Sequence, residues 1–133
     1  MLTDFCIDSD TLIYFLKGEK EVIEQMSKVP IGNLYTTRIN YTELLFGAYN
    51  STRVDDNLNK ILPFLENFKI LEFDKKSAEI FAKIKAKLKK DGQIIADMDL
   101  MIASISISNN CNLISNNTKH FSRIKELKLN NWL

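Results

Sequence analysis

Three groups of acidic residues lie beside apolar segments that are far apart in the chain. In order, they are Asp8 with Asp10, Glu43 alone, and Asp97 with Asp99. A carboxylate with apolar neighbours costs free energy unless it is paired or bound to a cation. Carboxylates that converge from different elements are typical of sites for Mg²⁺ or Mn²⁺, which bind water and phosphate oxygens. The pattern therefore predicts a metal site suited to the hydrolysis of a phosphodiester.

Most of these carboxylates also have an ordinary structural explanation. Asp10 precedes Thr11 and would cap a helix that begins there, and Asp97 would cap the helix that follows it. Asp99 would add a favourable charge to the first turn of that helix. Glu43 has no such explanation, because it lies inside a helical pattern among apolar side chains. The capping and metal-binding interpretations both stay open at this point.

Apolar spacing predicts strands that alternate with helices. The predicted strands are 5–7, 34–37, 68–73 and 112–115, with 127–129 as an edge strand. The predicted helices include 11–17, 22–26, 43–48, 58–65, 78–88 and 97–108. Such alternation predicts an α/β fold with a mainly parallel central sheet. Ligands of these sheets bind at the C-terminal strand ends near a switch point, where the acidic groups are expected to lie.

Composition narrows the function classes. A chain of 133 residues suits one domain, and 18 basic against 17 acidic residues exclude a histone-like protein. The single histidine, His120, excludes a multi-histidine zinc site, and four glycines exclude a P-loop or a GxGxxG fingerprint. Cys6 and Cys111 form no CxxC motif, and nothing at the N-terminus resembles a targeting or membrane-spanning segment. We therefore expect a cytoplasmic protein without a membrane anchor.

Four segments follow one another in a defined order. They are 5–13 with Asp8, 42–48 with Glu43, 95–103 with Asp99, and 113–121 with Asn117. In this order they resemble the motifs of PIN-domain ribonucleases of the VapC toxin type, and 127–132 resembles the closing strand and tryptophan of that family. The resemblance implies a three-layer α/β/α PIN-like fold, with residues 1–133 as a single domain.

The resemblance also implies an activity and its partners. It implies a Mg²⁺-dependent endoribonuclease, with Mn²⁺ as a substitute, in which Asp8, Glu43 and Asp99 hold the metal ion. Asn117 would orient a ligand water, and a metal-activated water would hydrolyse an RNA phosphodiester, with tRNA as a candidate substrate. The protein would be the toxin of a toxin–antitoxin pair, a homodimer silenced by a small antitoxin.

Two positions depart from the family pattern. The first motif reads Asp-Ser-Asp where the family usually has Asp-Thr-Asn, so Ser9 replaces a threonine hydroxyl and Asp10 adds a carboxylate. The fourth acidic position is Asn117, which is a neutral oxygen donor. Ser9 and Asp10 are therefore secondary site candidates, and Asp97 and Ser115 are two further secondary candidates.

Basic residues cluster in 74–91, which holds seven lysines against three acidic residues. Lys83, Lys87 and Lys90 share one helical face. This face is either a solvated outer surface or a rim that binds RNA phosphates without sequence preference. The individual candidates for phosphate contact are Arg38, Arg123 and Lys119.

Two other functions stay open from the sequence. The segment 8–10 after an apolar strand resembles the nucleophile motif of haloacid-dehalogenase-like phosphatases, and Ser115 resembles their second motif. However, Asp97 and Asp99 precede Ser115, which is the reverse of the order in that family. A nuclease-like fold that only binds RNA or protein would keep the same residues. Cleavage of RNA in Mg²⁺ or Mn²⁺, with and without EDTA, distinguishes these functions.

Overall fold

A parallel sheet forms the centre of the computed structural model, which describes residues 3–133. Its strands are β1 (Phe5–Ile7), β2 (Leu34–Thr37), β3 (Lys69–Leu71), β4 (Asn112–Ile114) and β5 (Leu129–Asn130). They lie in the order β3-β2-β1-β4-β5, and every neighbouring pair is parallel. The chain runs from β1 to β2 and β3, and later returns to β4 on the other side of β1. This reversal creates a switch point between β1 and β4, the place where open α/β sheets bind ligands.

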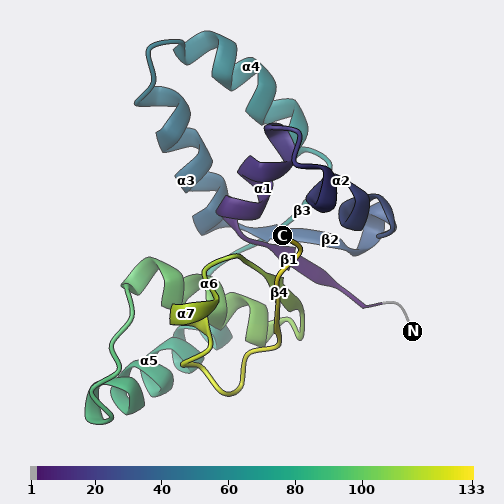
Figure 1. Ribbon diagram of the computed structural model, residues 1–133. Coiled ribbons are helices and arrows are strands. Elements are labelled where there is room, and N and C mark those ends of the chain that lie inside the picture. Colours follow the sequence, from purple (N-terminus) through teal and green to yellow (C-terminus); the bar gives the residue numbers. More distant parts are fainter. Residues whose placement is uncertain (1–2) are drawn as a thin grey trace.

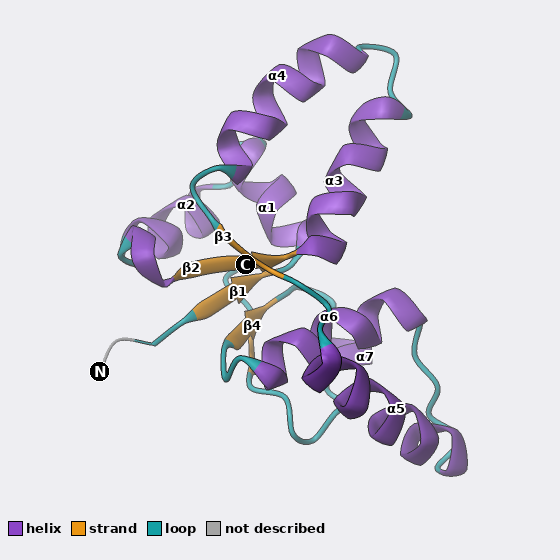
Figure 2. Cartoon of the chain, turned by 180° about the vertical axis from the view of Figure 1, so that it is seen from behind, coloured by secondary structure: helices purple, strands orange, loops and turns teal. Residues whose placement is uncertain are grey.

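Helices cover both faces of this sheet (Figure 1 and Figure 2). They are α1 (Ser9–Leu16), α2 (Lys20–Ser27), α3 (Arg38–Tyr49), α4 (Val54–Leu65), α5 (Lys75–Lys90), α6 (Asp97–Ser108) and α7 (Thr118–Phe121), with a short 3₁₀ helix, η1 (Ile31–Asn33), before β2. α1 to α4 lie on one face and α5 to α7 on the other. The predicted three-layer α/β/α fold is therefore confirmed. Within residues 3–133, no helix combines the length and the apolar character needed to cross a bilayer.

The side chains of the central strands divide the core into two halves. Cys6 and Leu113 face α5 and α6, and both are completely buried. Ile7 and Ile114 face α1 and α3 on the opposite side and are equally buried. Successive strand residues point to opposite faces, so an apolar run is covered on both sides in a parallel sheet. Packing on both faces fixes the C-terminal ends of β1 and β4.

Five of the six predicted helices begin two to five residues earlier than predicted, and both predicted N-caps are wrong. α1 begins two residues earlier than predicted, at Ser9, because Asp8 is its N-cap and accepts the Ser9 N–H at 2.9 Å. Asp10 lies in the first turn of α1, so its interpretation as the N-cap is wrong. α6 begins with Asp97 itself, and Ala96 occupies the cap position without a side-chain hydrogen bond. The interpretation of Asp97 as an N-cap is therefore wrong as well.

The outer strands are shorter than or shifted from the predicted ones. The predicted strand 68–73 is paired only over Lys69–Leu71, and the predicted edge strand 127–129 lies at Leu129–Asn130. β3 ends opposite the last residue of β2, since Thr37 pairs with Leu71 and no further partner follows. α7 is four residues long, which is too short to produce a periodic signal in the sequence.

Candidate active site

The C-terminal ends of β1 and β4 meet at the switch point. The backbone N–H of Asp8 donates to the carbonyl of Ile114 at 2.9 Å, which extends the pairing of the two strands. Ser115 follows β4 directly, and its hydroxyl donates to Asp8 Oδ2 at 2.7 Å. α3 follows β2 without a loop and contacts α6, so residues of both helices reach this edge of the sheet.

Asp8 is the most buried carboxylate of the site, with only 6% of the residue exposed. Its Oδ1 accepts the Ser9 N–H at 2.9 Å and Asn40 Nδ2 at 2.8 Å, while Oδ2 accepts the Ser115 hydroxyl. Burial raises the pKa of Asp8 to about 6, and repulsion from Asp10 adds to the rise, whereas the hydrogen bonds oppose it. A nearby cation would relieve both causes of the raised pKa.

Glu43 approaches Asp8 from α3. The hydroxyl of Ser9 donates to Glu43 Oε1 at 2.7 Å and so links the first turn of α1 to α3. Burial raises the pKa of Glu43, the hydrogen bond from Ser9 opposes the rise, and repulsion from Asp99 increases it. Glu43 and Asp99 therefore interact electrostatically although they belong to different helices.

The two acidic residues of α6 have different surroundings. Asp99 is half-buried; burial raises its pKa, His120 lowers it, and repulsion from Asp10 raises it further. Asp97 is exposed and forms an ion pair with Lys85, at 3.0 Å between Nζ and Oδ1. Asp99 therefore belongs with the other carboxylates, and Asp97 is directed toward α5.

Asp10 connects α1 to the loop after β4. Its Oδ2 accepts the backbone N–H of Asn116 at 3.0 Å. Asn117 donates its own N–H to Ser115 Oγ at 3.0 Å, and its Oδ1 lies 2.9 Å from Nδ1 of His120. Asp10 and Ser115 thus hold the loop that carries Asn117 beside Asp8, which is a structural role for both secondary site residues.

Asn40 is a site residue that sequence reasoning missed. It lies completely buried in the first turn of α3, where Nδ2 donates to Asp8 Oδ1 at 2.8 Å and to Ser9 Oγ at 2.9 Å. Its Oδ1 accepts the Thr37 hydroxyl at 2.7 Å, within a capping box. The available signal was spacing, because Asn40 lies three residues after Thr37 and three before Glu43 on one helical face.

The donor set suits a hard divalent cation. Asp8, Glu43 and Asp99 supply carboxylate oxygens, the ligands that Mg²⁺ prefers, and all three have a raised pKa because they are buried near like charges. In the described part of the chain, no three acidic, histidine or cysteine side chains lie together in a group that could hold a metal ion by itself. Mg²⁺ commonly binds one or two carboxylates and keeps several waters, so a closed cage is not required. The residues present fit the ion.

Comparison with known proteins identifies the family. Residues 5–127 match the PIN domain. The chain belongs to the PIN-domain family. Ribonuclease VapC2 of Haemophilus influenzae is 32% identical over 129 residues, which cover 97% of this chain and 98% of that protein. The tRNA(fMet)-specific endonuclease VapC of Salmonella typhimurium is 27% identical over 128 residues, or 96% of this chain and 97% of that protein. The resemblance to VapC ribonucleases is thus confirmed over nearly the whole chain.

Solved PIN-domain structures share the fold described above. One chain of VapBC2 from Rickettsia felis, bound to a DNA fragment from its promoter, matches with a TM-score of 0.91 and 27% identity, covering 98% of this chain and 100% of that one. A chain of VapBC-1 from nontypeable Haemophilus influenzae matches with a TM-score of 0.90 and 30% identity, covering 98% of both chains. The PIN-like fold is therefore confirmed in three dimensions as well.

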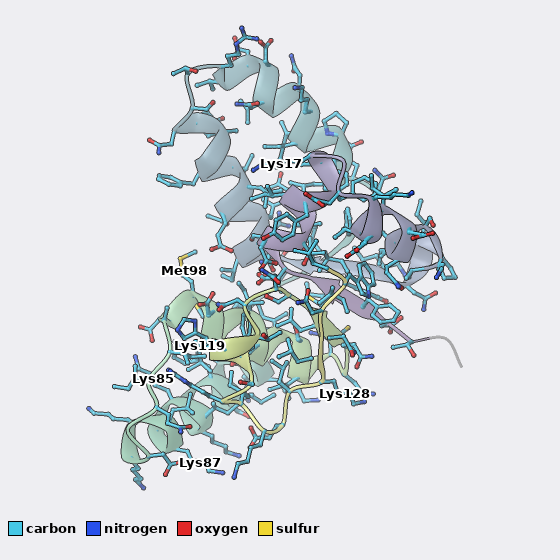
Figure 3. The ribbon with its side chains drawn as sticks, viewed as in Figure 1. Lys17, Lys85, Lys87, Met98, Lys119 and Lys128 are labelled. Carbon is cyan, nitrogen blue, oxygen red and sulfur yellow. The ribbon has the colours of Figure 1, made fainter. Side chains whose placement is uncertain are left out.

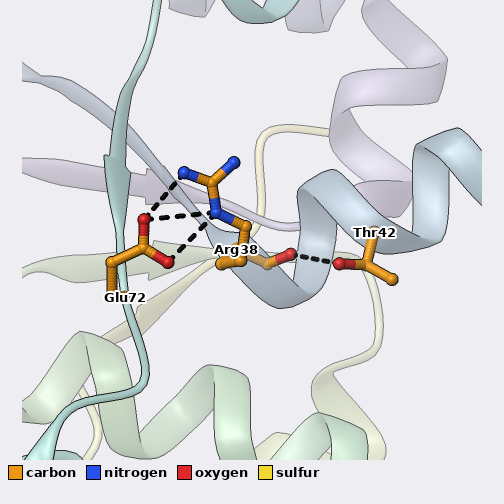
Figure 4. A network of polar contacts seen from close by, with 3 residues as sticks. All are labelled: Arg38, Thr42 and Glu72. Carbon is orange, nitrogen blue, oxygen red and sulfur yellow. Dashed lines mark hydrogen bonds and ion pairs between the residues drawn. The ribbon is translucent and has the colours of Figure 1, made fainter.

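Arg38, a predicted phosphate contact of this PIN domain, is already engaged by a carboxylate. Its Nη2 lies 2.7 Å from Glu72 Oε2 and its Nε donates to Oε1 at 3.0 Å (Figure 4). The guanidinium also lies over the ring of Tyr41, at 4.6 Å from the centroid. An RNA phosphate would have to compete with Glu72 for Arg38, so this contact stays a prediction.

The other basic candidates lie on the half of the molecule formed by α5 to α7. Arg123 donates from Nη1 to the carbonyl of Ile94 at 2.9 Å. Lys119 is exposed on α7, and Figure 3 shows it on the same half as Lys85 and Lys87. The lysines of α5 are all exposed, which agrees with a solvated face and equally with a phosphate-binding rim. Lys119 is nearest in sequence to the site, two residues after Asn117.

An apolar hollow adjoins the carboxylates of the PIN domain. Thr42, Glu43, Phe46 and Met98 line a space of about 500 Å³. Phe46 is 66% exposed and Met98 is 44% exposed. Figure 3 shows Met98 at the start of α6, near α3. The site thus has an acidic centre and an apolar border, a combination that suits a protein partner as well as RNA.

Proposed function

We propose that this member of the VapC family is a Mg²⁺-dependent endoribonuclease and the toxin of a toxin–antitoxin pair. The observation that carries the proposal is Asp8, which is buried at the switch point with donors on both oxygens and is linked through Asn40 and Ser9 to Glu43. Asp99 lies near enough to Glu43 for its charge to raise the pKa of Glu43. Full-length relatives named as ribonuclease and tRNA(fMet)-specific endonuclease support the same activity, with residues 1–133 acting as one PIN-like domain. Because its substrate would be cytosolic RNA, we place its action in the cytosol.

The mechanism assigns a role to each side chain of the site. Asp8, Glu43 and Asp99 would hold Mg²⁺, or Mn²⁺ in its place, directly or through water. When bound, the ion would lower the pKa of a water molecule and neutralise negative charge on the phosphate. Asn117 has Oδ1 engaged by His120, so its Nδ2 is left to orient a water or a phosphate oxygen. Hydrolysis at the phosphorus would leave a 5′-phosphate and a 3′-hydroxyl.

The substrate and partners follow from the relatives and from the surface. We take tRNA as the first substrate to test, because one full-length relative is named for cleavage of tRNA(fMet). Chains with this fold come from VapBC structures, so we propose that a small antitoxin silences this chain. We also propose that the toxin is a homodimer, as the resemblance to the family implies. The exposed Phe46 and Met98 beside Glu43 offer the antitoxin an apolar contact at the site.

One rival function fits the chain less well than a nuclease, and the other differs from a nuclease only in activity. A haloacid-dehalogenase-like phosphatase is disfavoured because Asp97 and Asp99 precede Ser115, which is the reverse of the order in that family. Membership in the PIN-domain family also disfavours this alternative. A module that binds RNA without cleaving it would keep every contact described here, and only an activity measurement separates it from a nuclease.

The test of the proposed function is cleavage of purified RNA. We expect the purified chain to cut tRNA in Mg²⁺ or Mn²⁺ and to leave it intact in EDTA. Mapping the new ends should show a 5′-phosphate. Binding of tRNA without cleavage in either metal would instead identify a non-catalytic module.

A further inference from the structure

We propose that Asn40 is a positioning residue that selects which oxygens of Asp8 and Glu43 are left to bind a divalent cation. The inference rests on the proposed function, because it concerns the same metal site. Asn40 is completely buried and donates to Asp8 Oδ1 at 2.8 Å and to Ser9 Oγ at 2.9 Å. A buried polar group with all its hydrogen bonds satisfied is held in one orientation.

Thr37 fixes the orientation of the Asn40 amide. The Thr37 hydroxyl oxygen accepts the backbone N–H of Asn40 at 3.1 Å and donates its own hydrogen to Asn40 Oδ1 at 2.7 Å. Oδ1 is therefore the acceptor end of the amide, and both hydrogens of Nδ2 are directed into the site. Rotating the amide by 180° would break the bond from Thr37 and place an oxygen against the carboxylate of Asp8.

Ser9 extends the effect of Asn40 to Glu43. A serine hydroxyl has one hydrogen to donate. Since Ser9 Oγ accepts from Asn40, it directs that hydrogen to Glu43 Oε1 at 2.7 Å. Asn40 itself lies 3.5 Å from the same oxygen, between Nδ2 and Oε1. One buried amide thus aligns two carboxylates that come from different helices.

The hydrogen bonds leave specific oxygens open. Two donors, Ser9 N–H and Asn40 Nδ2, occupy Oδ1 of Asp8, whereas among residues 3–133 only Ser115 donates to Oδ2. Glu43 Oε1 accepts from Ser9, and no donor within residues 3–133 reaches Oε2. A carboxylate oxygen accepts two hydrogen bonds or a metal in their place. Oδ2 of Asp8 and Oε2 of Glu43 are therefore the oxygens that the network keeps available for a cation.

Loss of the Asn40 amide should weaken cation binding without removing any ligand. Groups that orient metal ligands typically contribute about 10- to 100-fold to metal affinity. In Asn40→Ala, the carboxylates of Asp8 and Glu43 can rotate, and Ser9 can direct its hydrogen elsewhere. We expect the Kd for Mn²⁺ to rise about tenfold or more while the circular dichroism spectrum stays that of a folded protein.

The matched control is Asn33→Ala. Asn33 donates from Nδ2 to Asp4 Oδ1 at 2.7 Å, which is the same type of bond at the opposite ends of β1 and β2. Isothermal titration calorimetry with Mn²⁺ and no RNA compares the two variants with the wild type. We expect the Kd of Asn33→Ala to stay within about twofold of the wild type, a smaller change than an orienting group produces. An unchanged Kd in folded Asn40→Ala would overturn the proposal.

A second variant keeps the proposal testable if Asn40→Ala does not fold. Ser9→Ala removes only the hydroxyl that connects Asn40 to Glu43, and Ser9 is only partly buried. We expect a several-fold weaker Mn²⁺ affinity for Ser9→Ala, and no change would again overturn the proposal. If both single variants fold, the double variant Ser9→Ala/Asn40→Ala should lose less Mn²⁺ affinity than the product of the two single fold-losses. The reason is that both residues act through one network.

Cleavage kinetics separate positioning from general damage. For Asn40→Ala, we expect the Mn²⁺ concentration at half-maximal RNA cleavage to rise about tenfold, with a smaller loss of kcat at saturating Mn²⁺. A loss of kcat alone, with unchanged Mn²⁺ dependence, would contradict the positioning role. Failure of the proposed function has a different signature, since the wild type itself would then bind no Mn²⁺ or would bind it without cutting RNA.

Discussion

Ser115 donates a 2.7 Å hydrogen bond to Asp8 Oδ2, across 107 residues of sequence. The bond joins the residue after β4 to the residue after β1, and Ser115 is completely buried. The same hydroxyl oxygen accepts the N–H of Asn117 at 3.0 Å. Ser115 therefore fixes the distance between the first and the fourth acidic positions of the PIN-domain site.

Asp8→Asn should separate catalysis from folding. The substitution keeps the volume of the side chain and removes a buried charge that Asp10 repels. We expect RNA cleavage to fall by about 100-fold or more, since a bound metal ion contributes several kcal/mol to such reactions. Without metal, the variant should be as stable as the wild type or more stable. Cleavage assays and thermal unfolding in EDTA measure both effects, and full activity would show that the first motif is misassigned.

The stability of the metal-free protein should fall as the pH rises. The pKa of Asp8 is raised from 3.8 to about 6 in the folded state, so folded Asp8 holds its proton more tightly than unfolded Asp8. The stabilisation of the folded state that comes from this tighter proton binding is complete below about pH 4. It is lost as the pH rises through about 6. For Asp8 alone, the free energy of unfolding should drop by about 1 kcal/mol between pH 5 and pH 7.5.

Urea unfolding in EDTA at these two pH values tests the expected drop. Asp8→Asn is the control, because its stability lacks this contribution and should depend less on pH. The pKa values of Glu43 and Asp99 are raised as well, so they add a pH dependence of the same sign in both proteins. An identical pH dependence of wild type and Asp8→Asn would contradict the raised pKa of Asp8.

Asp97→Ser should leave cleavage nearly unchanged. Asp97 is exposed and pairs with Lys85 at 3.0 Å, away from the carboxylates of the site. An exposed ion pair contributes about 0.5 kcal/mol, so stability should change little. Lys85→Ala removes the same pair from the other side and should match Asp97→Ser in thermal unfolding. A cleavage loss as large as that of a site aspartate would make Asp97 a ligand.

The positions of the acidic residues could be predicted because each depends on a strand or helix boundary. Asp8 follows an apolar run that is buried on both faces, and parallel sheets place such residues at the edge that binds ligands. The orientation of Asp97 and Asp99 could not be predicted in the same way. Two residues apart on a helix, they are separated by about 200° around the axis, and either one could face the site.

The hydrogen-bond network could not be predicted from spacing alone. Asn40 reads in the sequence as an ordinary polar residue near the start of a helix. Its importance depends on complete burial and on the approach of Asp8 and Ser9 from a strand end 31 to 32 residues earlier. The fold creates this contact when β1 and β2 pair in parallel, because the residues after both strands then meet at one edge.

Mg²⁺ should weaken inhibition by the antitoxin that we propose. An arginine of the partner would pair with the carboxylates of Asp8, Glu43 or Asp99 and so exclude the metal ion. Raising the Mg²⁺ concentration should then increase the amount of antitoxin needed for half-inhibition of RNA cleavage. Inhibition that is independent of Mg²⁺ but abolished by Phe46→Ser would show that the apolar hollow alone carries the contact.

Single-turnover cleavage of tRNA by the wild type and by Asp99→Asn tests the central claim most directly. Asp99 is half-buried, and no hydrogen bond from residues 3–133 reaches its carboxylate, so its substitution disturbs the metal site with little effect on the hydrogen-bond network. We predict that the wild type cleaves tRNA only when Mg²⁺ or Mn²⁺ is present. For folded Asp99→Asn we predict a cleavage rate that is lower by about 100-fold or more. Wild-type cleavage that persists in EDTA, or full cleavage by Asp99→Asn, would contradict a metal-dependent ribonuclease built on these carboxylates.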